Sequence, residues 1–176
     1  MNGRVVRLSA DIVSPVTVWM PASPAGSAAL WLPLLGLSVL IILLQAVLWP
    51  IRQLVRRKFG AAIALQGVHL AAYRGTGLFA WGVVFAVAGW VLFVVTASGD
   101  ATMLGGPLDW LLNTLLIVLP LSAVGLALAA AAHLILSFGQ KRSWFAHIGR
   151  LLLLLSAMVL IWIVFSNNLY GFGLQF

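Results

Sequence analysis

Residues 28–49 read AALWLPLLGLSVLIILLQAVLW, a run of 22 residues without a charge. At about 1.5 Å per residue, a helix of this length crosses the roughly 30 Å hydrocarbon core of a bilayer. Three later stretches have a similar apolar character, at residues 75–97, 108–136 and 148–169. The sequence therefore predicts an all-α membrane protein, with a domain of four transmembrane helices over residues 28–176.

The overall composition excludes a soluble globular domain. Hydrophobic residues make up 63% of the 176 residues and charged residues 7%, whereas soluble domains average about 45–50% and 25%. The acidic residues are Asp11, Asp100 and Asp109, and the chain has no Glu and no Cys. Paired-carboxylate catalysis, disulfides and thiolate chemistry therefore have almost no side chains to use.

The basic residues cluster in two connecting segments. Eight of the ten Lys and Arg residues lie in residues 50–74 and 139–150. Cytoplasmic loops carry an excess of Lys and Arg, so both segments are predicted to be cytoplasmic. The loop at residues 98–109 holds two acids and no base, and it is predicted to be external together with both termini. Topology then accounts for the net charge of +7, and no nucleic-acid partner is expected.

Residues 1–27 are predicted to form an extracytoplasmic tail or linker. Pro15, Pro21 and Pro24 interrupt the apolar core that a signal peptide would need. Between them, the β-branched stretch at residues 13–19 favours a short extended segment.

The segment after Pro50 mixes basic and apolar residues. We expect a cytoplasmic helix in the membrane interface, whose cations face anionic lipid head groups. These cations are Arg52, Arg56, Arg57 and Lys58. The alternative is ordinary stop-transfer charge followed by a hydrophobic connector.

Few polar side chains fall within the spans. Gln45, Asn113 and Thr114 are predicted to form helix-to-helix hydrogen bonds in preference to a transport path, since no ionisable residue is expected near the midplane. The histidines, His69, His133 and His147, have no metal-ligand spacing, so no metal site is predicted. We expect His133 to be structural or to reach interfacial water, and the role of Gln45 stays open.

Small residues indicate how the spans pack. Gly82, Ala86 and Gly89 share one face of the second span, and Ala123, Ala127 and Ala130 share one face of the third. Such stripes let two helix backbones approach closely in a membrane. We therefore predict that these stripes are contact faces.

Prolines and tryptophans mark positions along the spans. Pro50 is predicted to end the first helix, and Pro120 to kink the third. The tryptophans near span ends are predicted to lie in the aromatic belt, and the others to pack deeper. The first group is Trp31, Trp49, Trp110 and Trp144, and the second is Trp81, Trp90 and Trp162.

Several stretches together resemble a known membrane region. They are DIVSPVTVWMPASPAGSAALWLPLLGLSVL (11–40), LWPIRQLVRRKFG (48–60), LAAYRGTG (70–77), AGW (88–90) and NNLYGFGLQF (167–176). In this order they resemble the C-terminal transmembrane region of bacterial serine hydrolases of the class C β-lactamase and penicillin-binding-protein-like superfamily. The resemblance implies a catalytic domain that precedes the membrane region and lies outside the cytoplasm.

The catalytic motifs of that superfamily do not map onto this chain. Its Ser-x-x-Lys nucleophile is missing, because Ser137 and Lys141 are one residue too far apart. Tyr170 does not lead to an Asn, and His147-Ile148-Gly149 opens an apolar helix. No catalytic, cofactor-binding or metal residue is carried over, and we expect a chain that is not an enzyme, with no serine paired with a base.

The resemblance implies a non-catalytic integral membrane module, detached or truncated here. It would anchor or position a β-lactamase-like hydrolase domain at the outer face of the bacterial cytoplasmic membrane. The alternative is an independent small membrane protein that acts as an accessory or scaffold subunit of a membrane complex, with a transporter as the less favoured version. Substrate, ligand and oligomeric state are not predicted.

Overall fold

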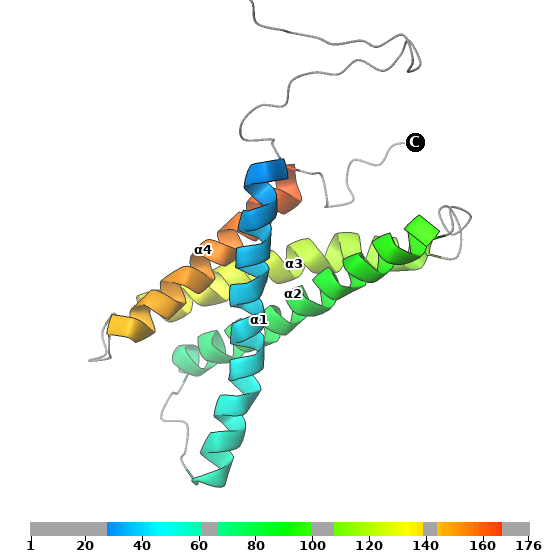
Figure 1. Cartoon of the computed structure of the whole chain (residues 1–176). Coiled ribbons are helices and arrows are strands. Elements are labelled where there is room, and N and C mark those ends of the chain that lie inside the picture. The colour runs from blue at the N-terminus through cyan, green and yellow to red at the C-terminus, as the bar shows by residue number, and fades with distance from the viewer. Residues whose placement is uncertain (1–27, 61–66, 100–107, 139–143, 167–176) are drawn as a thin grey trace, which may run out of the picture. The chain divides into compact units, whose positions relative to one another are not determined.

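A computed structural model of the chain describes residues 28–60, 67–99, 108–138 and 144–166. These contain four helices, α1 (Ala28–Lys58), α2 (Gly67–Gly99), α3 (Asp109–Ile135) and α4 (Trp144–Ser166), and no strand (Figure 1). All four are long and apolar enough to cross a membrane. The predicted all-α fold with four spans is therefore confirmed, and the chain is a multi-pass membrane protein. The tail at residues 1–27, with the extended segment expected at 13–19, lies outside the described residues.

The chain divides into two compact units, Met1–Leu34 and Leu35–Phe176. Of the first unit, the structure describes only the opening residues of α1. The second unit holds the rest of α1 together with α2, α3 and α4. The packing described below lies entirely within this second unit.

The prediction that the first helix ends at Pro50 is wrong. Helix α1 continues to Lys58. A proline inside a helix removes one backbone donor, and the turns beyond it close normally: the Phe59 amide donates to the Val55 carbonyl at 3.1 Å. Gly60, with φ 62°, then ends the helix. The basic residues of the last turn suit the negative end of the helix dipole. The described part of the expected interfacial segment is thus a continuation of α1, while α2 already begins at Gly67.

Helix α2 packs against α3, and α3 also packs against α4 (Figure 1). A Cβ atom added at Gly82 would lie 2.5 Å from Ser122 Oγ, and one at Gly89 would lie 2.7 Å from Leu115 Cδ2. Ala86, Ala123 and Ala130 are buried in the core. The prediction that the stripe on α2 is a contact face is confirmed. On α3, Ala123 and Ala130 of the predicted stripe are buried and Ala127 is partly buried.

Helix α1 contacts the other helices through its side chains and not through close approach of its backbone. In the described part of the chain, no Cα atom of α1 lies within 8 Å of a Cα atom of another helix. Its side chains bridge the distance: Ile42 and Ala46 are 0% exposed, and the indole of Trp49 occupies the space that a Cβ atom at Gly77 would need. Gly77 therefore acts as a notch for Trp49.

Two of the predictions for polar and aromatic residues are wrong. Thr114 does not bond to another helix, because its hydroxyl donates to the Trp110 carbonyl of its own helix at 2.7 Å. Asn113 is exposed like Thr114. Trp162 is 41% exposed instead of deeply packed, since the small residues Ser156 and Ala157 mark the opposite, buried face of α4.

The remaining tryptophans divide as follows. Trp110 and Trp144 are exposed at the first turns of α3 and α4, as a position in the aromatic belt requires. Trp81 and Trp90 pack against the core, as expected. Trp49 was expected in the belt, but its position over Gly77 makes it a packing residue.

Candidate functional site

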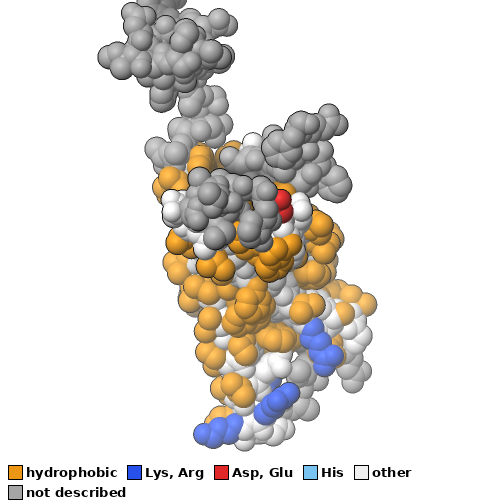
Figure 2. Space-filling view, turned by 90° about the vertical axis from the view of Figure 1, so that its right-hand side faces the viewer, with side chains coloured by type: hydrophobic (Ala, Val, Ile, Leu, Met, Phe, Trp, Pro, Cys, Tyr) orange, Lys and Arg blue, Asp and Glu red, His pale blue; other side chains and the backbone are white. Residues whose placement is uncertain are grey.

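Positive charge gathers at one end of the four-helix unit. Figure 2 shows the Lys and Arg side chains at one end of the apolar surface, whereas acidic atoms lie toward the other end. Asp109, in the first turn of α3, is the acidic residue among those the structure describes. The two ends of the unit therefore differ in charge, as the loop composition predicted.

A pocket of about 470 Å³ lies at the basic end and is lined by all four helices. Helix α1 supplies one wall and α4 the wall facing it, while α2 and α3 each add one aromatic ring. The described lining residues are Ile41, Leu44, Gln45, Leu48, Arg52, Arg56, Tyr73, His133, Phe145, Ala146, Gly149, Arg150, Leu152 and Leu153.

The wall formed by α1 changes from apolar to cationic along its length. Apart from Gln45, which is next to Leu44, its lining residues are three or four positions apart, so they share one face of the helix. Ile41, Leu44 and Leu48 come first, and Arg52 and Arg56 follow toward the basic end. The pocket therefore has an apolar end within the span and a charged end near the helix terminus.

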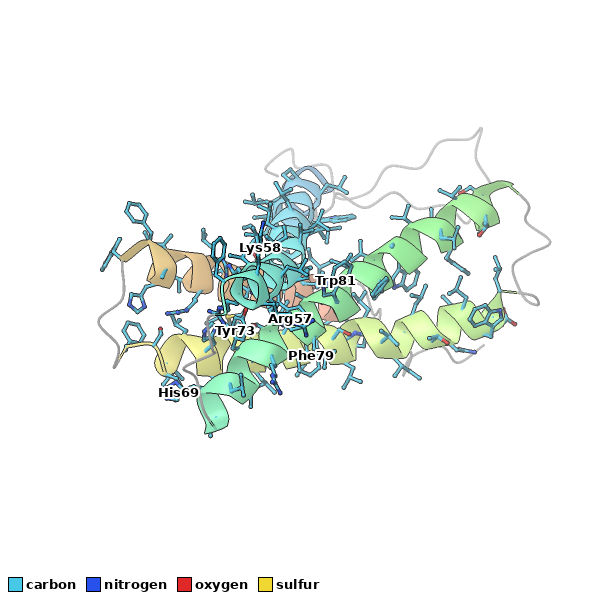
Figure 3. The ribbon with its side chains drawn as sticks, turned by 90° about the horizontal axis from the view of Figure 1, so that it is seen from below. Arg57, Lys58, His69, Tyr73, Phe79 and Trp81 are labelled. Carbon is cyan, nitrogen blue, oxygen red and sulfur yellow. The ribbon has the colours of Figure 1, made fainter. Side chains whose placement is uncertain are left out.

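Tyr73 is the central side chain of the charged end. The guanidinium carbon of Arg56 lies 5.5 Å from the centroid of the Tyr73 ring, a distance at which a cation and an aromatic face attract. The ring of His133 meets Tyr73 edge-on at 6.1 Å. Figure 3 looks at this end from below and labels Tyr73 together with Arg57 and Lys58 at the end of α1. Tyr73 thus connects α1 to α3 through two ring contacts.

Two buried donors of this group lack an acceptor. Neither the Tyr73 hydroxyl nor Arg56 Nη1 finds a hydrogen-bond partner among the described residues. Tyr73 is only 5% exposed, and both residues line the pocket. A buried donor without an acceptor costs about 1–3 kcal/mol, more when it is charged. Both atoms are covered by neighbouring protein atoms, and an oxygen-bearing anion that displaced this cover from the pocket side would satisfy them.

The described lining residues include positive charges and no acidic side chain. Arg52 and Arg56 of α1 and Arg150 of α4 are cationic, and none of the described lining residues is Asp or Glu. Arginine forms bidentate bonds with carboxylate and phosphate groups, and it is hydrated more weakly than lysine. This end of the pocket is suited to bind an anion.

A second group of residues joins the end of α3 to α4. Ser137 Oγ lies 3.2 Å from His147 Nδ1, and the His147 ring stacks on Phe138 with ring centroids 5.5 Å apart. This pair of a hydroxyl and a possible base was not expected from the sequence, because ten residues separate the two. The Ser137 hydroxyl also donates to the Leu134 carbonyl at 2.6 Å. With its proton directed there, Ser137 Oγ can accept from His147 Nδ1 in the tautomer that is protonated at this nitrogen. The pair links the turn after α3 to the first turns of α4.

The structure settles where the polar residues singled out in the sequence lie. Gln45 and His133, whose roles were open, both line the pocket, and so do Arg52 and Arg56. Arg57 and Lys58 are exposed and are not among its lining residues. The sequence analysis missed Tyr73 and Arg150 as members of the site. The described residues contain no group of His and Asp residues placed to hold a metal ion.

Comparison with protein-family models, curated proteins and solved structures finds no match to this chain. The resemblance to the membrane region of serine hydrolases therefore stays a prediction from the quoted stretches.

Proposed function

We propose that this chain is a non-catalytic membrane module that binds an anionic amphiphile in the pocket between its helices. The observation that supports this function is the pairing, in one cavity, of a charged end and an apolar end. Tyr73 and Arg56 offer buried donors at the first, and Ile41 and Leu44 line the second. A molecule with an anionic head and a hydrocarbon chain matches both ends, whereas a small inorganic anion matches only one.

Solvation supports a buried head group. Moving a charged group out of water is costly, and the cost is offset only when the group is paired and hydrogen-bonded. An anion between Arg52, Arg56 and Tyr73 would gain opposite charges and donors at once. A head group already at the membrane surface would lose less hydration than a free anion on entering.

We also propose that the basic end of the unit faces the cytoplasm of a bacterial cell, with both termini outside. The support is the charge distribution in the loops, because Lys and Arg are retained on the cytoplasmic side. Reporter fusions after Lys58 and Lys141 should behave as cytoplasmic, and fusions after Thr102 and Phe176 as external. A fusion after Lys58 that reports an external position would reverse the orientation.

Binding is tested by lipid retention. Protein extracted from vesicles of phosphatidylcholine, phosphatidylglycerol and phosphatidic acid should retain anionic phospholipid in excess of phosphatidylcholine, measured by mass spectrometry. Arg56→Gln should weaken retention at least tenfold, because one charge-assisted hydrogen bond is worth about 1.5–3 kcal/mol and 1.4 kcal/mol is a factor of ten.

The matched control is Arg57→Gln, which removes the same charge from the next residue of α1 but outside the pocket lining. It should change retention less than twofold. If Arg56→Gln and Arg57→Gln weaken retention equally, the lipid is held by surface charge and the pocket has no such function.

Anchoring of a hydrolase domain is a separate proposal, which rests on the resemblance alone. It predicts an open reading frame joined upstream to this one and encoding a Ser-x-x-Lys motif. A stop codon followed by an independent ribosome-binding site before Met1 would favour the alternative of an accessory or scaffold subunit.

A further inference from the structure

Exposed leucines of two helices are among the residues that line the pocket. Helices α1 and α4 both line it, yet no Cα atom of one lies within 8 Å of a Cα atom of the other in the described residues. Leu44 and Leu48 of α1 and Leu152 of α4 line the pocket and are also exposed. In a membrane, such a surface is in contact with lipid chains. A hydrocarbon chain can therefore leave the pocket between these leucines and remain in the bilayer.

The charged end distinguishes between kinds of phosphate. A phosphodiester carries one negative charge and two free oxygen atoms. A terminal phosphate carries about −1.5 to −2 at neutral pH and three acceptor oxygens. Three arginine residues line the pocket without a carboxylate among the described lining residues, and the Tyr73 hydroxyl adds a neutral donor. The greater charge and the additional oxygen of a terminal phosphate match this set better.

We propose that the pocket binds a lipid whose head group ends in a terminal phosphate. The phosphate lies among Arg52, Arg56, Arg150 and Tyr73, and the hydrocarbon chain leaves between α1 and α4 along Leu44, Leu48 and Leu152. This inference rests on the proposed function and adds the chemistry of the head group and the path of the chain.

The head group is tested by titration in nanodiscs of phosphatidylcholine. Phosphatidic acid, which has a terminal phosphate, should bind at least tenfold more tightly than phosphatidylglycerol, a phosphodiester of the same chain length. Inorganic phosphate added to the same nanodiscs without anionic lipid should bind at least a hundredfold more weakly than phosphatidic acid.

The outcomes separate the inference from the proposed function. If the two lipids bind with equal affinity and Arg56→Gln abolishes the binding of both, the preference for a terminal phosphate is overturned. The proposed binding of an anionic amphiphile is then still supported. Inorganic phosphate that binds as tightly as phosphatidic acid would overturn the role of the hydrocarbon chain. Absence of binding by all three probes would overturn both proposals.

The path of the lipid's hydrocarbon chain is tested by placing a larger side chain along it. Leu44→Trp should weaken phosphatidic acid binding at least fivefold and leave the affinity for inorganic phosphate unchanged. Leu43→Trp is the matched control, because Leu43 is an exposed neighbour on α1 that is not among the described lining residues. Retention of the monomer on size-exclusion chromatography checks that both variants fold. If Leu44→Trp and Leu43→Trp bind phosphatidic acid equally, the hydrocarbon chain of the lipid does not leave the pocket along Leu44.

Discussion

The contact between α2 and α3 and the contact that holds α1 use opposite means. Glycine and alanine bring the backbones of α2 and α3 together, so that a Cβ atom at Gly82 would lie 2.5 Å from Ser122 Oγ. Helix α1 keeps its backbone away and reaches its neighbours with Trp49, Ile42 and Arg56. Lipid chains are as apolar as leucine, so association in a membrane depends on packing and on polar contacts. The close contact provides stability, and the wide contact leaves space for a pocket.

The largest effect is expected in the close contact. Gly82→Leu and Gly89→Leu should each destabilise the folded protein by about 1–3 kcal/mol, because the added side chain meets Ser122 or Leu115. The measurement is retention of folded monomer during heating in detergent. Gly36→Leu on α1 is the control, since a Cβ atom there meets nothing within 4 Å. If Gly82→Leu and Gly36→Leu melt at the same temperature, the described contact between α2 and α3 is absent in detergent.

A smaller effect is expected at the notch that receives Trp49. Gly77→Ala places a methyl group where the indole lies, and should cost about 1–2 kcal/mol unless α1 shifts. The double variant Gly77→Ala, Trp49→Ala should recover part of the loss, because the clash is then removed. A double variant that is destabilised by the sum of the two single changes would show that the two residues do not touch.

The link between Ser137 and His147 should contribute less. Ser137→Ala removes the hydrogen bond to His147 and should lower stability by about 0.5–1.5 kcal/mol, measured by thermal unfolding in detergent. We also expect no labelling of the parent chain by a fluorophosphonate, since the Ser137 proton is engaged with the Leu134 carbonyl. Stoichiometric labelling that disappears in Ser137→Ala would identify Ser137 as a nucleophile and contradict the non-catalytic proposal.

The smallest effect on stability is expected at Tyr73. Tyr73→Phe removes a buried hydroxyl without a partner among the described residues, so unfolding in lipid-free detergent should shift by less than about 0.5 kcal/mol or move toward higher stability. Phosphatidic acid should stabilise the parent more than Tyr73→Phe. A clear loss of stability without lipid would mean that the hydroxyl already has an acceptor in detergent.

Hydropathy predicted the spans because the bilayer sets both their length and their composition. The stripe from Gly82 to Gly89 was readable for the same reason, since close approach in lipid requires small residues. The end of α1 could not be predicted in this way, because the helical hydrogen bonds continue beyond Pro50 although the proline lacks one backbone donor. Position along the chain could not show that Thr114 bonds within its own helix.

The candidate site was less predictable. Arg52 and Arg56 stood out as cations, but the sequence gives no distance between them, Tyr73 and Arg150. These residues lie on three helices, and their proximity depends on how the helices are rotated about their axes. Helices this apolar on every side carry little information about rotation. His133 and Gln45 could be noted as polar residues in apolar spans, but not assigned to a common cavity.

The notch at Gly77 also fixes the position of α1 along its own axis. A slide by one helical turn, about 5.4 Å, replaces each side chain by the one four residues away. In one direction Arg52 would come to the place of Arg56 beside Tyr73, and a guanidinium would remain there. In the other direction the replacement is Gly60, which ends the helix. The four-residue repeat of arginines therefore lets the contact with Tyr73 survive translation in one direction only, although Leu48 would then take the place of Arg52. The packing of Trp49 against Gly77 selects the register.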